Sequence, residues 1–147
     1  MDNMVSGSIV TFNNISTIEK TLETIFTQTK DIDFKLYIVD NGSSDGTPEF
    51  VEKNYPQVSV IRNEKNVGFG AGHNIIINSV KSSYHAIINP DIVLKENVIK
   101  KMVDYMEENQ DIGLLSPRIC FPDGRDQILG KRNPRLKYLV ASRLRGF

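Results

Sequence analysis

The side chains of this sequence that can carry out chemistry stand directly behind short apolar runs. They form four groups, namely Thr11 to Asn13, Asp40 with Asn41, Asn63 to Gly72, and Asn89 to Asp91. Asp91 suits a hard cation, because Mg²⁺ and Mn²⁺ prefer oxygen ligands and are commonly held by one or two carboxylates together with substrate phosphates. A cation there would neutralise a leaving diphosphate. The pattern therefore predicts a site for a diphosphate ligand and for Mg²⁺ or Mn²⁺.

The other polar groups suit the remaining parts of a nucleotide. The carboxylate of Asp40 can accept hydrogen bonds from a pyrimidine N–H or from ribose hydroxyls, and the ring of Phe12 can lie against the base. The glycines between 68 and 72 let the backbone approach a phosphate, and a helix that starts near Ala71 would present free N–H groups to it. Together these residues predict the binding of a nucleoside diphosphate.

Each of these residues also has a purely structural explanation. Asp91 can cap the turn that follows it, since Asn and Asp are favoured in turns. Asp40 can close a turn in "DNGSSDG", a role that is compatible with ligand binding, and the glycines can serve turn formation alone. The two histidines, His73 and His85, are assigned structural roles. It is the occurrence of all the groups together that favours a binding site.

Short apolar runs alternate with amphipathic stretches, which predicts strands and helices in turn. Ser16 and Glu19 have the spacing of a capping box for the first helix, and Thr47 is expected to cap a second helix that opens with Pro48. The predicted strands span 6–12, 34–40, 58–63, 84–88 and 112–117, the third and fourth helices span about 71–80 and 96–109, and a tight turn lies at 121–125.

This order of elements predicts an α/β fold with a Rossmann-like, mostly parallel sheet and helices on both faces. Ligands of such sheets bind outside the carboxyl ends of the strands. The four polar groups all follow predicted strands, so we expect them to meet at one edge of the sheet.

Length and composition fit one globular domain. The chain has 147 residues, 39% of them apolar and 24% charged, and no apolar run approaches the about 18 residues of a membrane span. The single cysteine, Cys120, excludes an internal disulfide and fits a reducing compartment. We therefore predict a cytoplasmic protein, and we expect no nucleic-acid partner.

Four stretches of the sequence resemble the family 2 glycosyltransferases of the GT-A fold, and these stretches are "IVTFNN", "LYIVDNGSSDGT", "NVGFGAGHN" and "IINPDIVL". They lie between Ile9 and Leu94, and the likeness continues more loosely to the end of the chain. The resemblance implies transfer of a sugar from a nucleotide donor, with inversion and a bound divalent metal. With the patterns above, it implies nucleotide contacts at Thr11, Phe12, Asn13, Asp40, Asn41, Gly70, Asn74 and Asn89, and a metal ligand at Asp91.

The sequence departs from the family pattern at the metal motif. Asn89 replaces the first Asp of the Asp-x-Asp motif. This Asn-Pro-Asp form is similar to a branch rich in rhamnosyltransferases of bacterial cell-surface polysaccharides. The resemblance therefore points to a dTDP-linked donor such as dTDP-rhamnose, or to a UDP-linked sugar, and to a saccharide or lipid-linked acceptor.

A second departure concerns the catalytic base, which in the family is an acid well downstream of the metal motif. No acid after Asp91 matches it convincingly, since Asp123 and Asp126 lie in a predicted hairpin. We therefore expect the base downstream of Phe147. The chain is interpreted as the donor-binding portion of a longer enzyme and is expected to be inactive alone.

The last residues of the chain form a basic segment. Residues 131–147 contain six Lys and Arg and no acid, and Leu136, Leu139, Val140 and Leu144 recur at a helix-like spacing. We therefore predict a donor-binding domain over 1–130 and an amphipathic segment over 131–147 that leads into an acceptor-binding part. That part, a second copy of the chain, or an anionic membrane at the inner face of the cell could cover the apolar side of the segment.

Two other functions stay open. A sugar nucleotidyltransferase shares such a sheet and metal, but "TFNNIS" stands where its Gly-rich, Arg-containing loop is expected. A nucleotide-binding module without catalysis also fits this chain, because the base is missing. Assays with nucleotide sugars distinguish these alternatives from a glycosyltransferase.

Overall fold

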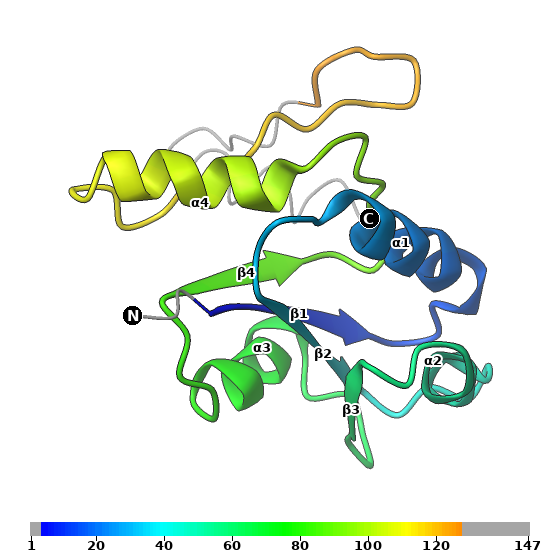
Figure 1. The fold of residues 1–147 in the computed structure, drawn as a ribbon. Helices are drawn as coiled ribbons and strands as arrows, with labels where there is room; N and C mark the ends of the chain where they lie inside the picture. The colour runs from blue at the N-terminus through cyan, green and yellow to red at the C-terminus, as the bar shows by residue number, and fades with distance from the viewer. Residues whose placement is uncertain (1–3, 128–147) are drawn as a thin grey trace, which may run out of the picture. The chain divides into compact units, whose positions relative to one another are not determined.

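A computed structural model describes residues 4–127 of the chain. Strands and helices alternate in it as the sequence predicts (Figure 1). In chain order the elements are β1 (Val5–Thr11), α1 (Ile15–Gln28), β2 (Phe34–Asp40), α2 (Thr47–Asn54), β3 (Ser59–Arg62), α3 (Phe69–Ile77), β4 (Tyr84–Ile88) and α4 (Val98–Glu108). The fold class predicted from the sequence is therefore confirmed.

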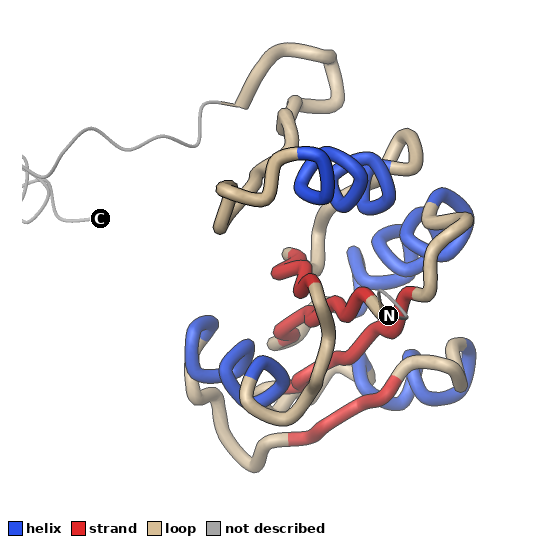
Figure 2. The backbone as a smooth tube through the Cα atoms, turned by 60° about the vertical axis from the view of Figure 1, so that its left-hand side comes forward, coloured by secondary structure: helices blue, strands red, loops and turns tan. Residues whose placement is uncertain are grey.

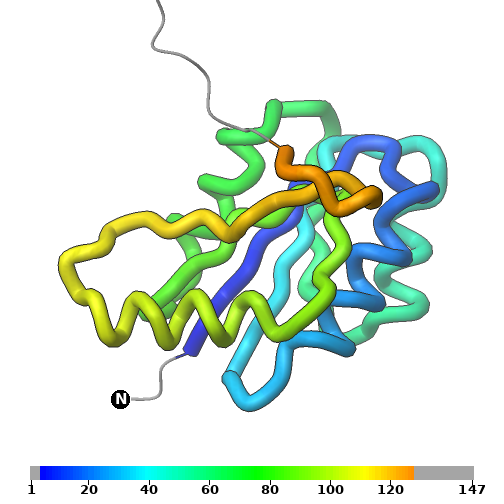
Figure 3. The backbone as a smooth tube through the Cα atoms, turned by 90° about the horizontal axis from the view of Figure 1, so that it is seen from above, coloured from blue at the N-terminus to red at the C-terminus, as the bar shows by residue number. Residues whose placement is uncertain are grey.

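The strands form one sheet with the order β3-β2-β1-β4, and all three pairings are parallel. β1 runs through the middle of the sheet (Figure 3). After β3 the chain returns past β2 and β1 to add β4 on the far side, so the strand order reverses between β1 and β4. Ligands of doubly wound sheets bind outside the carboxyl ends of the strands at such a switch point.

Helices cover both faces of the sheet (Figure 2). On one face Ile9 of β1 packs with Leu22 of α1, Val51 of α2 and residues of α4 in the larger hydrophobic core. On the other face α3 covers β1 and β2, where Val10 and Ile76 belong to a smaller core. Alternate residues of β1 therefore face different helices, as expected for a buried central strand.

α3 lies close to β1 because position 72 is glycine. A Cβ atom built on Gly72 would lie 2.7 Å from Cγ2 and 3.0 Å from Cγ1 of Val10. Real Cβ atoms do not come that close to another carbon, so any side chain would push α3 away from the sheet. Gly70 in the same helix has nothing within 4 Å of such an atom.

We therefore expect Gly72→Ala to lower the free energy of unfolding by about 1–3 kcal/mol, because it overpacks the contact with Val10. Gly70→Ala is the matched control and should raise stability by up to about 1 kcal/mol, since alanine favours a helix. Urea unfolding followed by circular dichroism measures both. Equal stability of the two variants would show that the close contact between α3 and β1 is not required.

The face of β1 and β4 near α3 also carries a chain of buried and half-buried polar side chains. Oγ of Ser6 lies 2.6 Å from Oγ of Ser82 and 2.6 Å from Nδ1 of His85. Oγ of Ser8 lies 2.7 Å from Nε2 of His85 and 2.7 Å from Nδ1 of His73. Burial lowers the pKa of both imidazoles, and the nearby His85 lowers the pKa of His73 further. Both histidines are therefore structural, as the sequence analysis proposed.

These two histidines should make stability fall in mild acid. Their pKa is lower in the folded chain than the about 6.5 of an unfolded one, so the unfolded state binds protons first as the pH falls. The contribution of the neutral histidines to the free energy of unfolding is complete above about pH 6.5 and is lost as the pH falls below that value. The chain contains 2 histidines, so His73→Gln with His85→Gln removes all histidine titration. Urea unfolding gives the free energy of unfolding at pH 7.5 and at pH 5.5. The difference between these two values should be smaller in the double variant than in the unaltered chain, and an unchanged difference would refute the prediction.

Several local predictions are wrong. Ser16 and Glu19 make no capping box, because α1 already begins at Ile15 and its cap position is Asn14. Residues 112–117 form no strand, and Leu114 in this segment is 88% exposed, which explains why the apolar pattern alone misled. α3 starts at Phe69, before the predicted Ala71.

The chain divides into two compact units, with the boundary between Leu115 and Ser116. In the second unit, Cys120 and Asp126 form an antiparallel bridge across a turn in which Gly124 has a φ of 87°. The predicted tight turn at 121–125 is therefore present. The basic segment 131–147 lies outside the described residues, so its predicted helix, its partner and the proposed boundary at residue 130 stay predictions.

Candidate functional site

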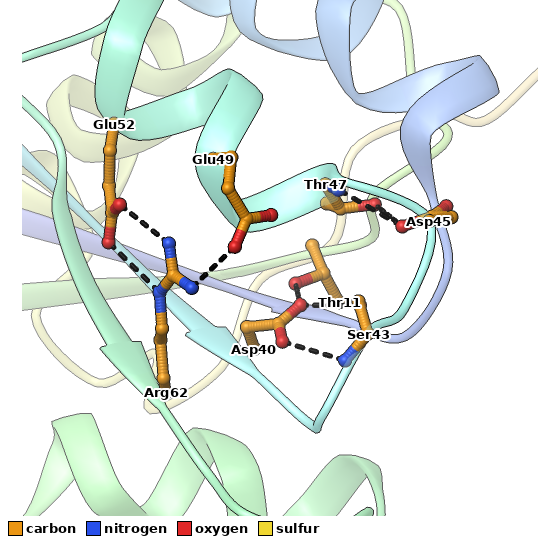
Figure 4. Close-up of polar contacts among 8 residues, drawn as sticks. All are labelled: Thr11, Asp40, Ser43, Asp45, Thr47, Glu49, Glu52 and Arg62. Atoms are coloured by element: carbon orange, nitrogen blue, oxygen red, sulfur yellow. Dashed lines mark hydrogen bonds and ion pairs between the residues drawn. The ribbon is translucent and has the colours of Figure 1, made fainter.

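The carboxyl ends of β1 and β2 are joined through Asp40. Thr11 and Asp40 are register partners in the sheet, and the Thr11 hydroxyl donates a 2.9 Å hydrogen bond to Oδ1 of Asp40. The backbone N–H of Ser43 donates to Oδ2 at 2.8 Å, and its hydroxyl donates to Oδ1 at 2.5 Å (Figure 4). Asp40 is only 2% exposed. Its carboxylate therefore shapes the loop after β2, which is the turn role that the sequence allowed.

The loop after β1 is bound to the loop after β2. The backbone N–H of Asn13 donates to Oγ of Ser43 at 2.8 Å, and the N–H of Ser44 donates to Oδ1 of Asn13 at 2.9 Å. Asn13 has a φ of 56°, a left-handed conformation that asparagine tolerates better than most residues. The predicted contacts Thr11, Asn13 and Asp40 thus belong to one hydrogen-bonded edge.

Asp45 stabilises the first turns of two helices. Its Oδ2 accepts the N–H of Ile15 at 2.9 Å, and its Oδ1 accepts the N–H of Thr47 at 3.0 Å and the Thr47 hydroxyl at 2.6 Å. Burial raises the pKa of Asp45, but these hydrogen bonds outweigh burial and hold the pKa below its usual value. Thr47 is the first residue of α2 and not its cap, which is Gly46. A single carboxylate therefore fixes α1 and α2 relative to the edge.

Asn41 connects the loop after β2 to the loop before α3. Its Nδ2 donates to Oδ1 of Asn66 at 3.1 Å and to the carbonyl of Gly68 at 3.4 Å, while its Oδ1 accepts from Nδ2 of Asn63 at 2.9 Å. Asn41 is 2% exposed. Its side chain therefore connects the two loops, and its predicted contact with a nucleotide is replaced by a role in positioning this edge of the sheet. Gly68 has a φ of 88°, which favours glycine at the start of α3.

Two aromatic rings are exposed at this edge. Phe12, predicted to lie against a base, is 48% exposed, and Phe69 in the first turn of α3 is 54% exposed. Gly70 and Asn74 of the same helix are also exposed. The sequence analysis missed Phe69, although its place next to the glycines was a usable signal. The surface therefore offers flat apolar groups beside the free N–H groups of a helix start.

Asn89 and Asp91 follow β4 on the other side of the switch point, and both are exposed. Asp91 makes no hydrogen bond or ion pair with any residue between 4 and 127. Within the same range no three His, Cys, Asp or Glu side chains are grouped to hold a metal by themselves. Asp91 therefore fits the predicted metal only as one protein carboxylate that shares the cation with ligand phosphates, which is a common mode for Mg²⁺.

Charged side chains pair with one another at the end of β3 and, separately, within the second unit. Arg62 at the end of β3 bonds to Glu49 at 2.6 Å and to Glu52 at 2.6 Å, both on α2 (Figure 4). Asp123 and Asp126 of the second unit pair with Arg125 at 2.7 Å and with Arg118 at 2.6 Å. The hydrogen bonds from these arginines lower the pKa of both carboxyls. Carboxylates with a lowered pKa are poor general bases, in agreement with the sequence analysis.

Comparisons with known proteins fit this geometry. The model of the family described as glycosyl transferase family 2 matches residues 8–146. A glycosyltransferase of Methanocaldococcus jannaschii is 32% identical over 137 residues, which cover 89% of this chain and 47% of that protein. The N-acetylglucosaminyl-diphospho-decaprenol L-rhamnosyltransferase of Mycobacterium tuberculosis is 27% identical over 110 residues, which cover 67% of this chain and 36% of the relative. The chain thus spans less than half the length of these relatives.

Solved structures show the same fold. Residues 1–349 of TarS of S. aureus, in complex with UDP, superpose with a TM-score of 0.66 at 22% identity, over 73% of this chain and 33% of that TarS chain. A mannosyltransferase of Pyrobaculum calidifontis in complex with GDP-Man and Mn²⁺ superposes with a TM-score of 0.63 at 21% identity, over 69% of this chain and 32% of that enzyme. In the part of the chain that the structure describes, no helix is long and apolar enough to cross a membrane.

Proposed function

The chain belongs to glycosyl transferase family 2, and from this premise we propose that its carboxyl-edge site binds a nucleoside diphosphate sugar whose sugar is transferred to an acceptor hydroxyl. The observation that carries the proposal is the exposed carboxylate of Asp91, which has no partner among residues 4–127 and lies across the switch point from Thr11 and Phe12. An exposed carboxylate on one side of the switch point suits the diphosphate end of a nucleotide, and an exposed ring on the other side suits its base.

In the proposed pose the base lies against Phe12, next to the edge that Asp40 and Asn13 build. The diphosphate approaches the N–H groups at the start of α3, with Gly70, Asn74 and Asn89 around it. Asp91 would hold Mg²⁺ or Mn²⁺ beside the phosphates. When bound, the cation neutralises the negative charge that grows on the diphosphate.

The reaction that this arrangement supports is an in-line displacement. The acceptor oxygen forms a bond to the anomeric carbon while the bond from that carbon to the phosphate oxygen breaks, and the bonding electrons leave with the diphosphate. The proton of the acceptor hydroxyl passes to a base, which is not assigned among residues 4–127. The configuration at the anomeric carbon inverts.

For the donor sugar we propose rhamnose carried by dTDP, with UDP-linked sugars as the alternative. Support comes from the Asn89-Pro90-Asp91 motif and from the similarity to the mycobacterial L-rhamnosyltransferase. The complex of TarS with UDP-GlcNAc supports a pyrimidine nucleotide. The mannosyltransferase binds GDP-Man, whose base is a purine, so this neighbour does not support a pyrimidine. We propose a saccharide or lipid-linked acceptor of the cell surface, reached from the cytoplasmic side.

The experiment that tests the proposal presents a panel of dTDP-, UDP- and GDP-linked sugars to the full-length protein with Mg²⁺ or Mn²⁺ and measures release of the nucleoside diphosphate. The proposal predicts that one pyrimidine donor is consumed and that chelation of the metal stops the reaction. Consumption of a nucleoside triphosphate and a sugar phosphate, with release of pyrophosphate, would instead identify a nucleotidyltransferase. No consumption of any donor would leave a binding module and refute the proposed transfer.

A further inference from the structure

The segment that carries Asp91 is held at both ends by two threonines of α1. The hydroxyl of Thr21 donates to the carbonyl of Pro90 at 3.0 Å, and the backbone N–H of Leu94 donates to Oγ1 of Thr24 at 3.1 Å. Both threonines are buried, with exposed fractions of 1% and 7%. Asp91 lies between Pro90 and Leu94, the two residues whose backbone these threonines bind.

Buried threonines are unexpected on the apolar face of a helix, because the hydroxyl must then find a partner. Thr21 also lies 3.3 Å from the carbonyl of Thr17, but the bond to Pro90 is the shorter of the two. Thr24 donates its own proton to the carbonyl of Thr21 at 3.1 Å, which leaves its oxygen to accept from Leu94. Each hydroxyl is therefore used in a defined direction, and each ties the loop to α1.

The side chains of this segment also attach it to the rest of the domain. Ile92 and Leu94 pack against the larger core, whereas Asp91 and Val93 are exposed. A further tie follows at Asn97, whose Nδ2 donates to the carbonyl of Lys30 at 2.9 Å just beyond α1. The loop thus follows α1 from Pro90 to Asn97, and its alternating pattern directs the Asp91 carboxylate outward.

We propose that Thr21 and Thr24 are positioning residues that hold Asp91 ready for the metal, an inference that rests on the proposed donor function. They touch neither the metal nor the nucleotide. They fix the backbone on both sides of a ligand that has no hydrogen-bond partner of its own within residues 4–127. We call Thr21 and Thr24 the clamp. A carboxylate held in this way loses less conformational freedom when the cation binds, so the clamp should raise the affinity for the metal.

The test compares Thr21→Val and Thr24→Val with Thr27→Val in calorimetric titrations of UDP, with and without Mn²⁺. Valine keeps the shape of threonine but removes the hydroxyl. Thr27 is the matched control, because it is exposed and its hydroxyl bonds to Glu23 within α1 at 2.8 Å. We expect each of these two variants to reduce the gain in UDP affinity that Mn²⁺ provides by about tenfold, which is the lower end of the loss seen when a group that orients a metal ligand is removed. UDP binding without metal should not change.

Two further measurements separate positioning from folding. Thr21→Ser should restore most of the Mn²⁺ effect, since serine keeps the donor. The Leu94 amide should exchange its hydrogen faster in Thr24→Val but not in Thr27→Val. A full Mn²⁺ effect in both clamp variants would overturn this inference while leaving the donor site intact. The absence of any Mn²⁺ effect on the binding of both UDP and dTDP in the unaltered protein would overturn the proposed donor site itself.

Discussion

Asp91→Ala should abolish the metal dependence of nucleoside diphosphate binding and leave the fold intact. In the unaltered chain we expect UDP or dTDP to bind much more tightly with Mn²⁺ than without it. Loss of an outer-sphere partner alone costs about 10- to 100-fold in metal affinity, so loss of the ligand itself should cost at least about 100-fold. Stability should change little, because Asp91 is exposed and unpartnered within the described residues. Calorimetry with and without Mn²⁺ measures the effect.

Asp111→Ala is a matched control, since Asp111 is also an exposed carboxylate but does not lie at the edge of the sheet. This control should retain the full Mn²⁺ effect. If Asp91→Ala retains it as well, Asp91 is not the metal ligand and its role is limited to the turn after β4.

Asp40→Asn should damage both stability and binding. The carboxylate accepts hydrogen bonds from Thr11 and Ser43, and an amide would place an N–H₂ donor against one of these donors. A buried polar group left without its partner costs about 1–3 kcal/mol, and more when a charge is involved, so we expect a loss of about 3 kcal/mol in the free energy of unfolding. UDP affinity should fall about tenfold or more, because the loop that holds Asn13 loses its support. Urea unfolding and calorimetry give the two values.

Asp31→Asn provides the control for the same chemical change at an exposed turn, where a φ of 58° suits asparagine equally well. It should leave stability and binding unchanged. Comparing UDP with GDP distinguishes two roles of Asp40. Since its carboxylate is buried and used by the loop, we expect both affinities to fall alike. A loss restricted to UDP would show that Asp40 reads the base directly, as its place in the sequence first suggested.

Much of the fold could be read from the sequence because it depends on local patterns. The apolar runs that end at Thr11, Asp40 and Ile88 are strands, and parallel pairing brings their polar successors to one edge. Leu114 shows the limit of this reasoning, because an apolar run alone does not decide whether neighbouring strands are present to cover it.

The details of the site depend on contacts between distant residues. Asp45 reaches the start of α1 across 30 positions, and Thr21 reaches Pro90 across 69. Local motifs at Ser16 and Glu19 predicted a cap that this distant carboxylate made unnecessary. For the same reason Asn41 was expected to face a ligand but lies buried between two loops. Side-chain types predicted the candidate site, whereas only the fold shows which of these side chains are exposed.

The most direct test of the account is to locate the bound metal and nucleotide within the sheet. Paramagnetic broadening of backbone amide signals by Mn²⁺ with UDP, compared with Mg²⁺ with UDP, reports distance from the cation. We predict broadening around Phe12, Ser43 and Asp91, at the carboxyl ends of the strands, and sharp signals for the strand starts Val5 and Phe34. Broadening that centres on the strand starts, or none that depends on UDP, would contradict the proposed donor site.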